Sequence, residues 1–148
     1  MSDIDIKITD NSGKILALEK QCRERALEMI GLQAERYAKE GAPVDTGRLR
    51  NSITYAMKAQ EGKSYSYTFN EKSADGKHLG QTQETSTIGS GITEYEVVIG
   101  TNVPYAFKQE TNESYHHTVG GAHFLKNAAG NHSDTYRKLI EMSYKGQK

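Results

Sequence analysis

Residues 14–40 carry the longest periodic pattern in the chain, and this pattern restricts the folds that it can adopt. Apolar residues recur there at helical spacing, so they form one stripe along a helix. The stripe contains Ile15, Leu18, Cys22, Ala26, Met29, Ile30 and Tyr37. Gly41 and Pro43 follow, and both residue types end helices. We predict a helix of about 25 residues, roughly 38 Å long, which is long for so small a domain. Part of its stripe should therefore pack against a neighbouring subunit.

Shorter periodic segments surround this helix. Strands are predicted over residues 3–9, 53–59, 64–70 and 94–100, where apolar and polar residues mostly alternate. The second and third strands should pair through the turn at residues 61–63. Short helices are predicted over residues 46–52 and 103–107, and a C-terminal helix from His123 that is kinked or broken at residues 130–132. Because strands and helices do not alternate regularly, the fold class is α+β: a small antiparallel sheet packed on the long N-terminal helix, with a C-terminal helix and a long polar loop.

Residues 71–91 differ in composition from the rest of the chain. Their only large aliphatic residues are Leu79 and Ile88. So polar a segment is predicted to be a mobile loop or an extended arm. The 148 residues otherwise suit one domain, spanning residues 1–148.

Composition limits the possible classes of function. Only 35% of the residues are apolar and the mean hydropathy is −0.75, so long loops or a core completed by a partner are expected. The 19 basic and 19 acidic residues cancel, which argues against a protein that wraps nucleic acid. Cys22 is the single cysteine, so no intramolecular disulfide can form, as is typical of the cytoplasm. No signal peptide or membrane-spanning segment is recognisable.

The best candidates for chemistry are three histidines in the second polar loop, His116, His117 and His123. With Glu110 or Glu113 they could bind a metal, but their spacing matches no established ligand pattern, so solvated loop histidines are the favoured interpretation. Cys22 lies on the apolar stripe and is predicted to be buried and inert. No serine has the surroundings of a nucleophile. We therefore expect neither an enzyme nor a cofactor.

Three further segments carry recognisable motifs. Residues 43–53 read PVDTGRLRNSI, residues 98–106 read VIGTNVPYA and are followed by Glu110, and residues 123–128 read HFLKNA. In this order they resemble the tail-component family of lambdoid and other long-tailed phages, whose members are neck, head–tail joining or tail-completion proteins. Two departures stand out: Thr111-Asn112-Glu113 replaces the usual FGT, and His123 replaces a proline.

The resemblance implies a structural virion protein without catalytic activity, assembled in the host bacterial cytoplasm. It would form a homo-oligomeric ring between head and tail. Its partners would be copies of itself and the neighbouring neck, head-connector and tail-terminator or tail-tube proteins. DNA would pass through the ring lumen without sequence-specific binding, and no membrane is involved. The alternative is a small metal-dependent or nucleic-acid-acting protein that uses the histidine-rich loop at residues 116–123.

Motif residues are the candidates for subunit contacts or for a structural role. They are Asp45, Thr46, Gly47, Arg48, Leu49, Arg50, Tyr105, Glu110 and Phe124. Asp45 and Thr46 should cap the following turn, and Gly47 permits a tight backbone. Arg48 and Arg50 should pair with carboxylates on a neighbour or within the sheet. Leu49 and Ile53 should enter the core.

Overall fold

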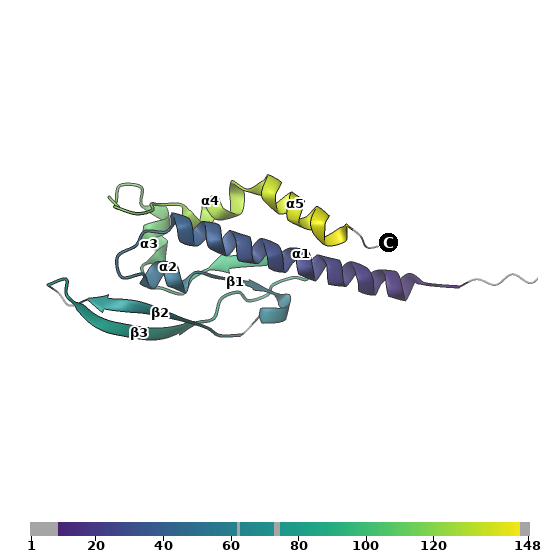
Figure 1. The fold of residues 1–148 in the computed structure, drawn as a ribbon, viewed down its shortest axis with the longest axis horizontal. Helices are drawn as coiled ribbons and strands as arrows, with labels where there is room; N and C mark the ends of the chain where they lie inside the picture. Colours follow the sequence, from purple (N-terminus) through teal and green to yellow (C-terminus); the bar gives the residue numbers. More distant parts are fainter. Residues whose placement is uncertain (1–8, 62, 73–74, 146–148) are drawn as a thin grey trace, which may run out of the picture.

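The computed structural model describes residues 9–61, 63–72 and 75–145. Helix α1 (Ser12–Gly41) runs through the middle of the molecule, with the C-terminal helices along one side and the paired strands β1 and β4 along the other (Figure 1). The predicted long helix and the α+β class are confirmed. The predicted strand at residues 3–9 lies almost wholly outside the described residues. Within the described part of the chain, no helix has both the length and the apolar composition to span a bilayer.

Small residues on α1 allow its neighbours to approach closely. Its buried positions are Cys22, Ala26, Gly31, Ala34 and Ala38. Glutamates and basic residues four positions apart pair along its other faces, as in Arg36–Glu40 and Lys39–Glu35. The N-terminal turns extend beyond the body of the molecule (Figure 1). Ile15 and Leu18 of the predicted stripe are therefore 67% and 39% exposed.

The strands form two separate antiparallel pairs. Strand β1 (Thr54–Met57) pairs with β4 (Val97–Gly100), and β2 (Tyr65–Lys72) pairs with β3 (His78–Ser86). The predicted pairing of the second and third strands is wrong, because the 3-10 helix η1 (Lys58–Gln60) ends β1 and redirects the chain. Of the two alternatives predicted for residues 71–91, a mobile loop or an extended arm, the mobile loop is wrong, since β3 occupies residues 78–86.

Polar side chains explain why β3 resembles a loop in the sequence. Its alternate residues Thr82, Glu84 and Ser86 are the less exposed ones, and none is apolar. In register they lie opposite Phe69, Tyr67 and Tyr65 of β2. The backbone ladder and these aromatic side chains therefore hold a strand that has no apolar alternation of its own.

Four short helices complete the fold: α2 (Arg48–Ser52), α3 (Ala106–Thr111), α4 (Phe124–Gly130) and α5 (Ser133–Tyr144). The predicted break in the C-terminal helix is confirmed between α4 and α5, where the His132 ring stacks on Tyr37 of α1, with centroids 3.6 Å apart. The main core lies where α1, α2, α3 and α4 meet. It consists of Ala38, Ala42, Leu49, Ile53, Val103, Ala106, Phe124 and Ala128.

Candidate functional site

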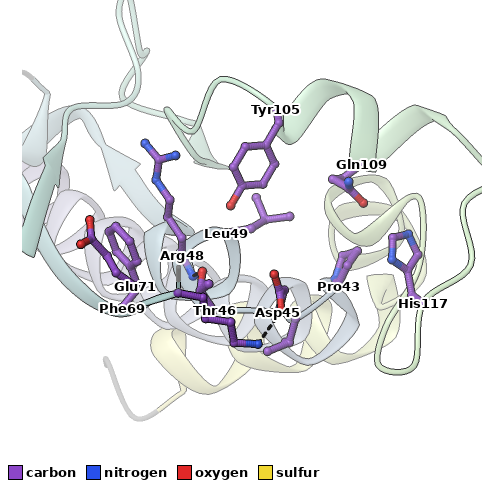
Figure 2. Close-up of a pocket in the computed structure, with 13 residues that line it drawn as sticks. Pro43, Asp45, Thr46, Arg48, Leu49, Phe69, Glu71, Tyr105, Gln109 and His117 are labelled. Carbon is purple, nitrogen blue, oxygen red and sulfur yellow. Dashed lines mark hydrogen bonds and ion pairs between the residues drawn. The ribbon is translucent and has the colours of Figure 1, made fainter. Parts of the chain in front are cut away.

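The first motif forms a turn between α1 and α2 beside a groove of about 600 Å³ (Figure 2). Gly47 has a φ of 85°, a left-handed conformation that glycine adopts without strain. The Thr46 hydroxyl accepts the Arg48 amide at 3.3 Å, which agrees with its predicted capping role. Asp45 does not cap: its carboxylate pairs with Lys72 of β2 at 2.7 Å. The predicted burial of Leu49 and Ile53 is confirmed.

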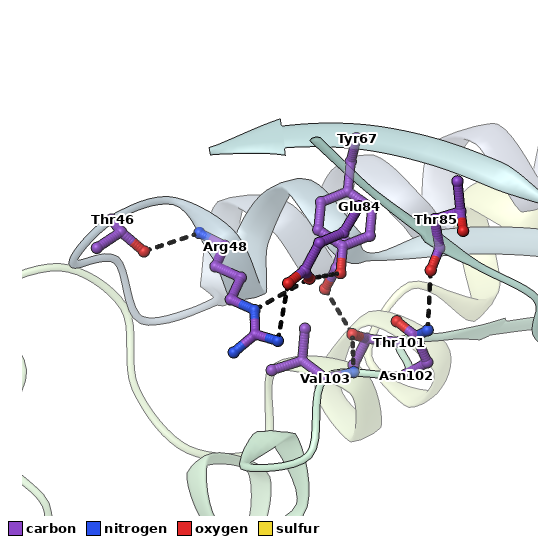
Figure 3. Close-up of polar contacts among 9 residues, drawn as sticks. Thr46, Arg48, Tyr67, Glu84, Thr85, Thr101, Asn102 and Val103 are labelled. Carbon is purple, nitrogen blue, oxygen red and sulfur yellow. Dashed lines mark hydrogen bonds and ion pairs between the residues drawn. The ribbon is translucent and has the colours of Figure 1, made fainter. Parts of the chain in front are cut away.

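Arg48 fastens this turn to the β2–β3 hairpin (Figure 3). Its Nε donates to Glu84 Oε2 and its Nη2 lies by Glu84 Oε1, both at 3.0 Å, so the pairing is bidentate. The Tyr67 hydroxyl donates to the same carboxylate at 2.6 Å. The guanidinium also lies over the rings of Phe69 and Tyr105, at 5.6 and 5.7 Å. Of the two alternatives predicted for Arg48, the partner is therefore a carboxylate of its own chain.

Hydrogen bonds from Tyr67 and Arg48 lower the pKa of Glu84 below its ordinary value of 4.5. Burial, together with the Glu84 carboxylate, raises the pKa of Tyr67 to about 12. Both shifts favour the same state, in which Glu84 is ionised and Tyr67 keeps its proton.

We expect acid to loosen the hairpin. Because the folded pKa of Glu84 lies below its unfolded value, its contribution to stability is complete above pH 4.5 and is lost as the pH falls through the folded pKa. NMR spectra of the β2 and β3 amides, recorded from about pH 6 to about pH 3, should show this transition. Glu84→Gln should show weaker hairpin order at neutral pH and lack the transition. An identical transition in this variant would contradict the assignment to Glu84.

The second motif joins the first through hydroxyl groups (Figure 3). The Ser52 and Thr101 hydroxyls lie 2.5 Å apart, and Ser52 also donates to the Leu49 carbonyl at 2.6 Å. Thr101 accepts the amide of Val103 at 3.1 Å. Asn102 donates from its side chain to the Thr85 carbonyl of β3, also at 3.1 Å. The loop after β4 therefore holds both α2 and the hairpin.

Glu110 joins the second motif to the third. Its two carboxylate oxygens accept the amides of Leu125 and Lys126, each at 2.9 Å, at the start of α4. Free amides and the helix dipole make this end of α4 a favourable place for a negative charge. His123, just before α4, has a φ of 61°, which proline cannot adopt. The backbone therefore accounts for the histidine at a position where proline is usual.

Removing the Glu110 carboxylate should destabilise the chain by about 1–2 kcal/mol, because the first amides of α4 lose their acceptor. Glu110→Ala should show this loss in urea unfolding, and Glu110→Gln a smaller one. Glu113→Ala is the matched control, since the Glu113 side chain is exposed and pairs with the half-buried His123 ring, at 2.6 Å, instead of with helix amides. Equal losses for Glu110→Ala and Glu113→Ala would contradict the capping role.

Comparison with known proteins shows the family to which this chain belongs. The family model described as "Bacteriophage HK97-gp10, putative tail-component" matches residues 7–125, about four fifths of the 148 residues. The chain belongs to this family. No curated protein and no solved structure matches it. The predicted family is therefore confirmed, and the protein is a phage structural protein related to the tail and associated with the virion.

In this tail-component protein, the three motifs meet in one corner of the fold. Arg48, Tyr105, Glu110 and Phe124 all contribute to it. Sequence reasoning missed Glu84, because the segment that carries it was predicted to be a loop. The alternation of Thr82, Glu84 and Ser86 opposite an aromatic strand is the signal that could have identified it.

The histidine-rich loop of this tail-component protein does not assemble the predicted ligands. Both oxygens of Glu110 are bound to α4 amides, and His123 pairs with Glu113. His117 lines the groove, with its Nε2 buried and lacking a hydrogen-bond partner in the described chain. Among the described residues, no group of three or more histidine, cysteine or acidic side chains is placed to hold a metal ion.

Proposed function

We propose that the chain is a ring-forming structural subunit of the phage head–tail interface, at the neck or tail-completion position, and that it joins the head to the tail. The observation that carries this proposal is the convergence of three family motifs on one structural corner. Their polar groups pair with one another, as between Ser52 and Thr101, and with backbone groups, as between Glu110 and the Leu125 amide. Such a corner holds the subunit in shape and leaves its outer surfaces for assembly.

The same pairing supports a role without catalysis. A general acid or base must reach a substrate proton, and a nucleophile needs an adjacent base. The Glu84 carboxylate is bound by Arg48 and Tyr67, and that of Glu110 by two amides. The buried hydroxyl of Ser52 is bound by the Leu49 carbonyl and the Thr101 hydroxyl, and no histidine of the described chain is among its hydrogen-bond partners.

Exposed apolar side chains support assembly with partners. Ile15, Leu16 and Leu18 lie on the first turns of α1, and Ile140, Met142 and Tyr144 lie on α5. The two groups belong to the same end of the molecule, where the Tyr144 hydroxyl donates to Glu19 of α1 at 3.1 Å. Clustered apolar surface of this kind is typical of protein interfaces.

The proposed partners are copies of the chain and the neighbouring neck, head-connector and tail-terminator or tail-tube proteins. Assembly would take place in the host bacterial cytoplasm, without a membrane. DNA would pass through the ring lumen without sequence-specific binding. The neutral net charge is compatible with this passage, because it offers little phosphate neutralisation to hold DNA tightly.

The proposal is tested by light scattering and negative-stain imaging of the purified full-length chain, alone and with its phage neighbours. We expect closed rings, or rings that form when a neighbouring neck or tail protein is added. In a phage that lacks this gene, heads and tails should accumulate unjoined. A strictly monomeric chain that enters no particle would overturn the proposal.

A further inference from the structure

Arg50, the second arginine of the first motif, has no charged partner among the described residues. Its Nε is buried and lacks a hydrogen-bond partner among the described residues, and no carboxylate of the described chain pairs with it. The residue lines a groove of about 440 Å³ against α1, together with Leu32, Glu35, Arg36, Lys39 and Glu40. We call this the Arg50 groove. Leu32 is 52% exposed and gives the groove an apolar surface. Arg36 and Lys39 pair with Glu40 and Glu35, so the uncompensated positive charge among the described groove residues is that of Arg50.

A complementary feature precedes β4. Tyr95 is 72% exposed and stands between Glu94 and Glu96, and we call residues 94–96 the Tyr95 knob. The guanidinium of Arg23 lies 4.6 Å from the centre of the Tyr95 ring and 3.6 Å from the Glu94 carboxylate, so the ring is held before any partner arrives. Tyrosine and arginine are enriched among the residues that dominate binding energy at interfaces.

The groove and the knob lie on opposite sides of α1. The knob contacts Arg23, and the groove contains Leu32, which is nine positions later. At roughly 100° per residue, nine positions rotate the helix face by two and a half turns, which is the opposite side. The other groove positions on α1, from Glu35 to Glu40, centre on this same side. Two different patches on opposite sides of one subunit can join copies head to tail, the geometry that generates rings.

We propose that the Tyr95 knob of one subunit enters the Arg50 groove of the next copy in the ring. The inference rests on the proposed ring function and assigns its subunit interface. Glu96, which has no cationic partner among the described residues, supplies a carboxylate for Arg50, and Tyr95 covers Leu32. The site is incomplete within one chain, because the neighbour provides the carboxylate that Arg50 lacks.

Disulfide trapping tests the contact and its direction. Leu32→Cys with Tyr95→Cys in one chain should give a ladder of covalent oligomers on oxidation. A bridge within the chain is not expected, because Leu32 lies roughly 13 Å along α1 from Arg23, which contacts Tyr95, and on the opposite side of the helix. A mixture of the two single variants should stop at covalent dimers, and neither single variant should dimerise alone. The natural Cys22 is buried and should not contribute. Self-linking of Leu32→Cys alone, or the absence of a ladder, would overturn the proposal.

Variants of the two surfaces provide a second readout. Tyr95→Ala and Arg50→Glu should each raise the protein concentration needed for half-assembly about tenfold or more. The double variant Arg50→Glu with Glu96→Arg, which exchanges the two charges, should recover part of the lost assembly. Phe107→Ala is the control, because Phe107 is equally exposed and belongs to neither surface. Circular dichroism should show that each variant remains folded.

The outcomes separate this inference from the proposed function. If the natural chain forms rings and Tyr95→Ala forms them at the same concentration, the interface is wrong and the ring function stands. If the natural chain forms no ring, alone or with its phage neighbours, both fail.

Discussion

Phe124→Ala should lower the free energy of unfolding by about 3–5 kcal/mol. The Phe124 side chain is 2% exposed and belongs to the core cluster formed by α1, α2, α3 and α4. Truncation removes its transfer energy and leaves a cavity that four helices cannot easily close. Because small domains are marginally stable, a loss of this size should leave much of the purified protein unfolded at 37 °C.

Urea unfolding followed by circular dichroism measures this effect. Phe107→Ala is a matched control, since it removes the same side chain from α3 at a position that is 76% exposed, and we expect a change within about 0.5 kcal/mol. Similar losses in the two variants would show that Phe124 does not lie at the centre of the core. The result bears on function, because this residue connects the third motif to the other two.

Gly120→Ala should destabilise the chain by roughly 3 kcal/mol or more. Gly120 has a φ of 73°, in the left-handed region, and an added Cβ would lie 2.3 Å from the Ala42 carbonyl oxygen. This obstacle is backbone rather than a side chain, so relief requires the loop to move away from the end of α1. That movement would break the bond from the Gly121 amide to the Gly41 carbonyl, now 3.1 Å long.

The adjacent Gly121→Ala provides the control for this variant. An added Cβ there meets nothing within 4 Å, and its φ is not in the left-handed region. Thermal unfolding of the two variants should therefore differ strongly, although both make the same chemical change one position apart. Equal melting temperatures would show that the loop does not lie against the end of α1.

Local patterns in the sequence were sufficient for part of this fold. The spacing of apolar residues in α1, the helix stop at Gly41 and Pro43, and the break before Ser133 all concern residues close together in the chain. Helix periodicity and backbone preferences act over such short distances, so each element could be located without its neighbours. The burial of Leu49 and Ile53 and the family itself were also recognisable from motifs in order.

Contacts between distant residues were decided only by the tertiary structure. Glu84 lies 36 positions from Arg48, and the amides that Glu110 binds lie 15 and 16 positions beyond it. The chain could have paired Arg48 with many carboxylates, and β1 with β2 through a short turn. Packing of β1 and β4 on α1, and of the polar β3 on an aromatic strand, selected one arrangement. The same packing placed a carboxylate beside Arg48 and left Arg50 facing a groove. Both arginines belong to the same motif, but which charged group each one meets depends on the three-dimensional packing of distant segments.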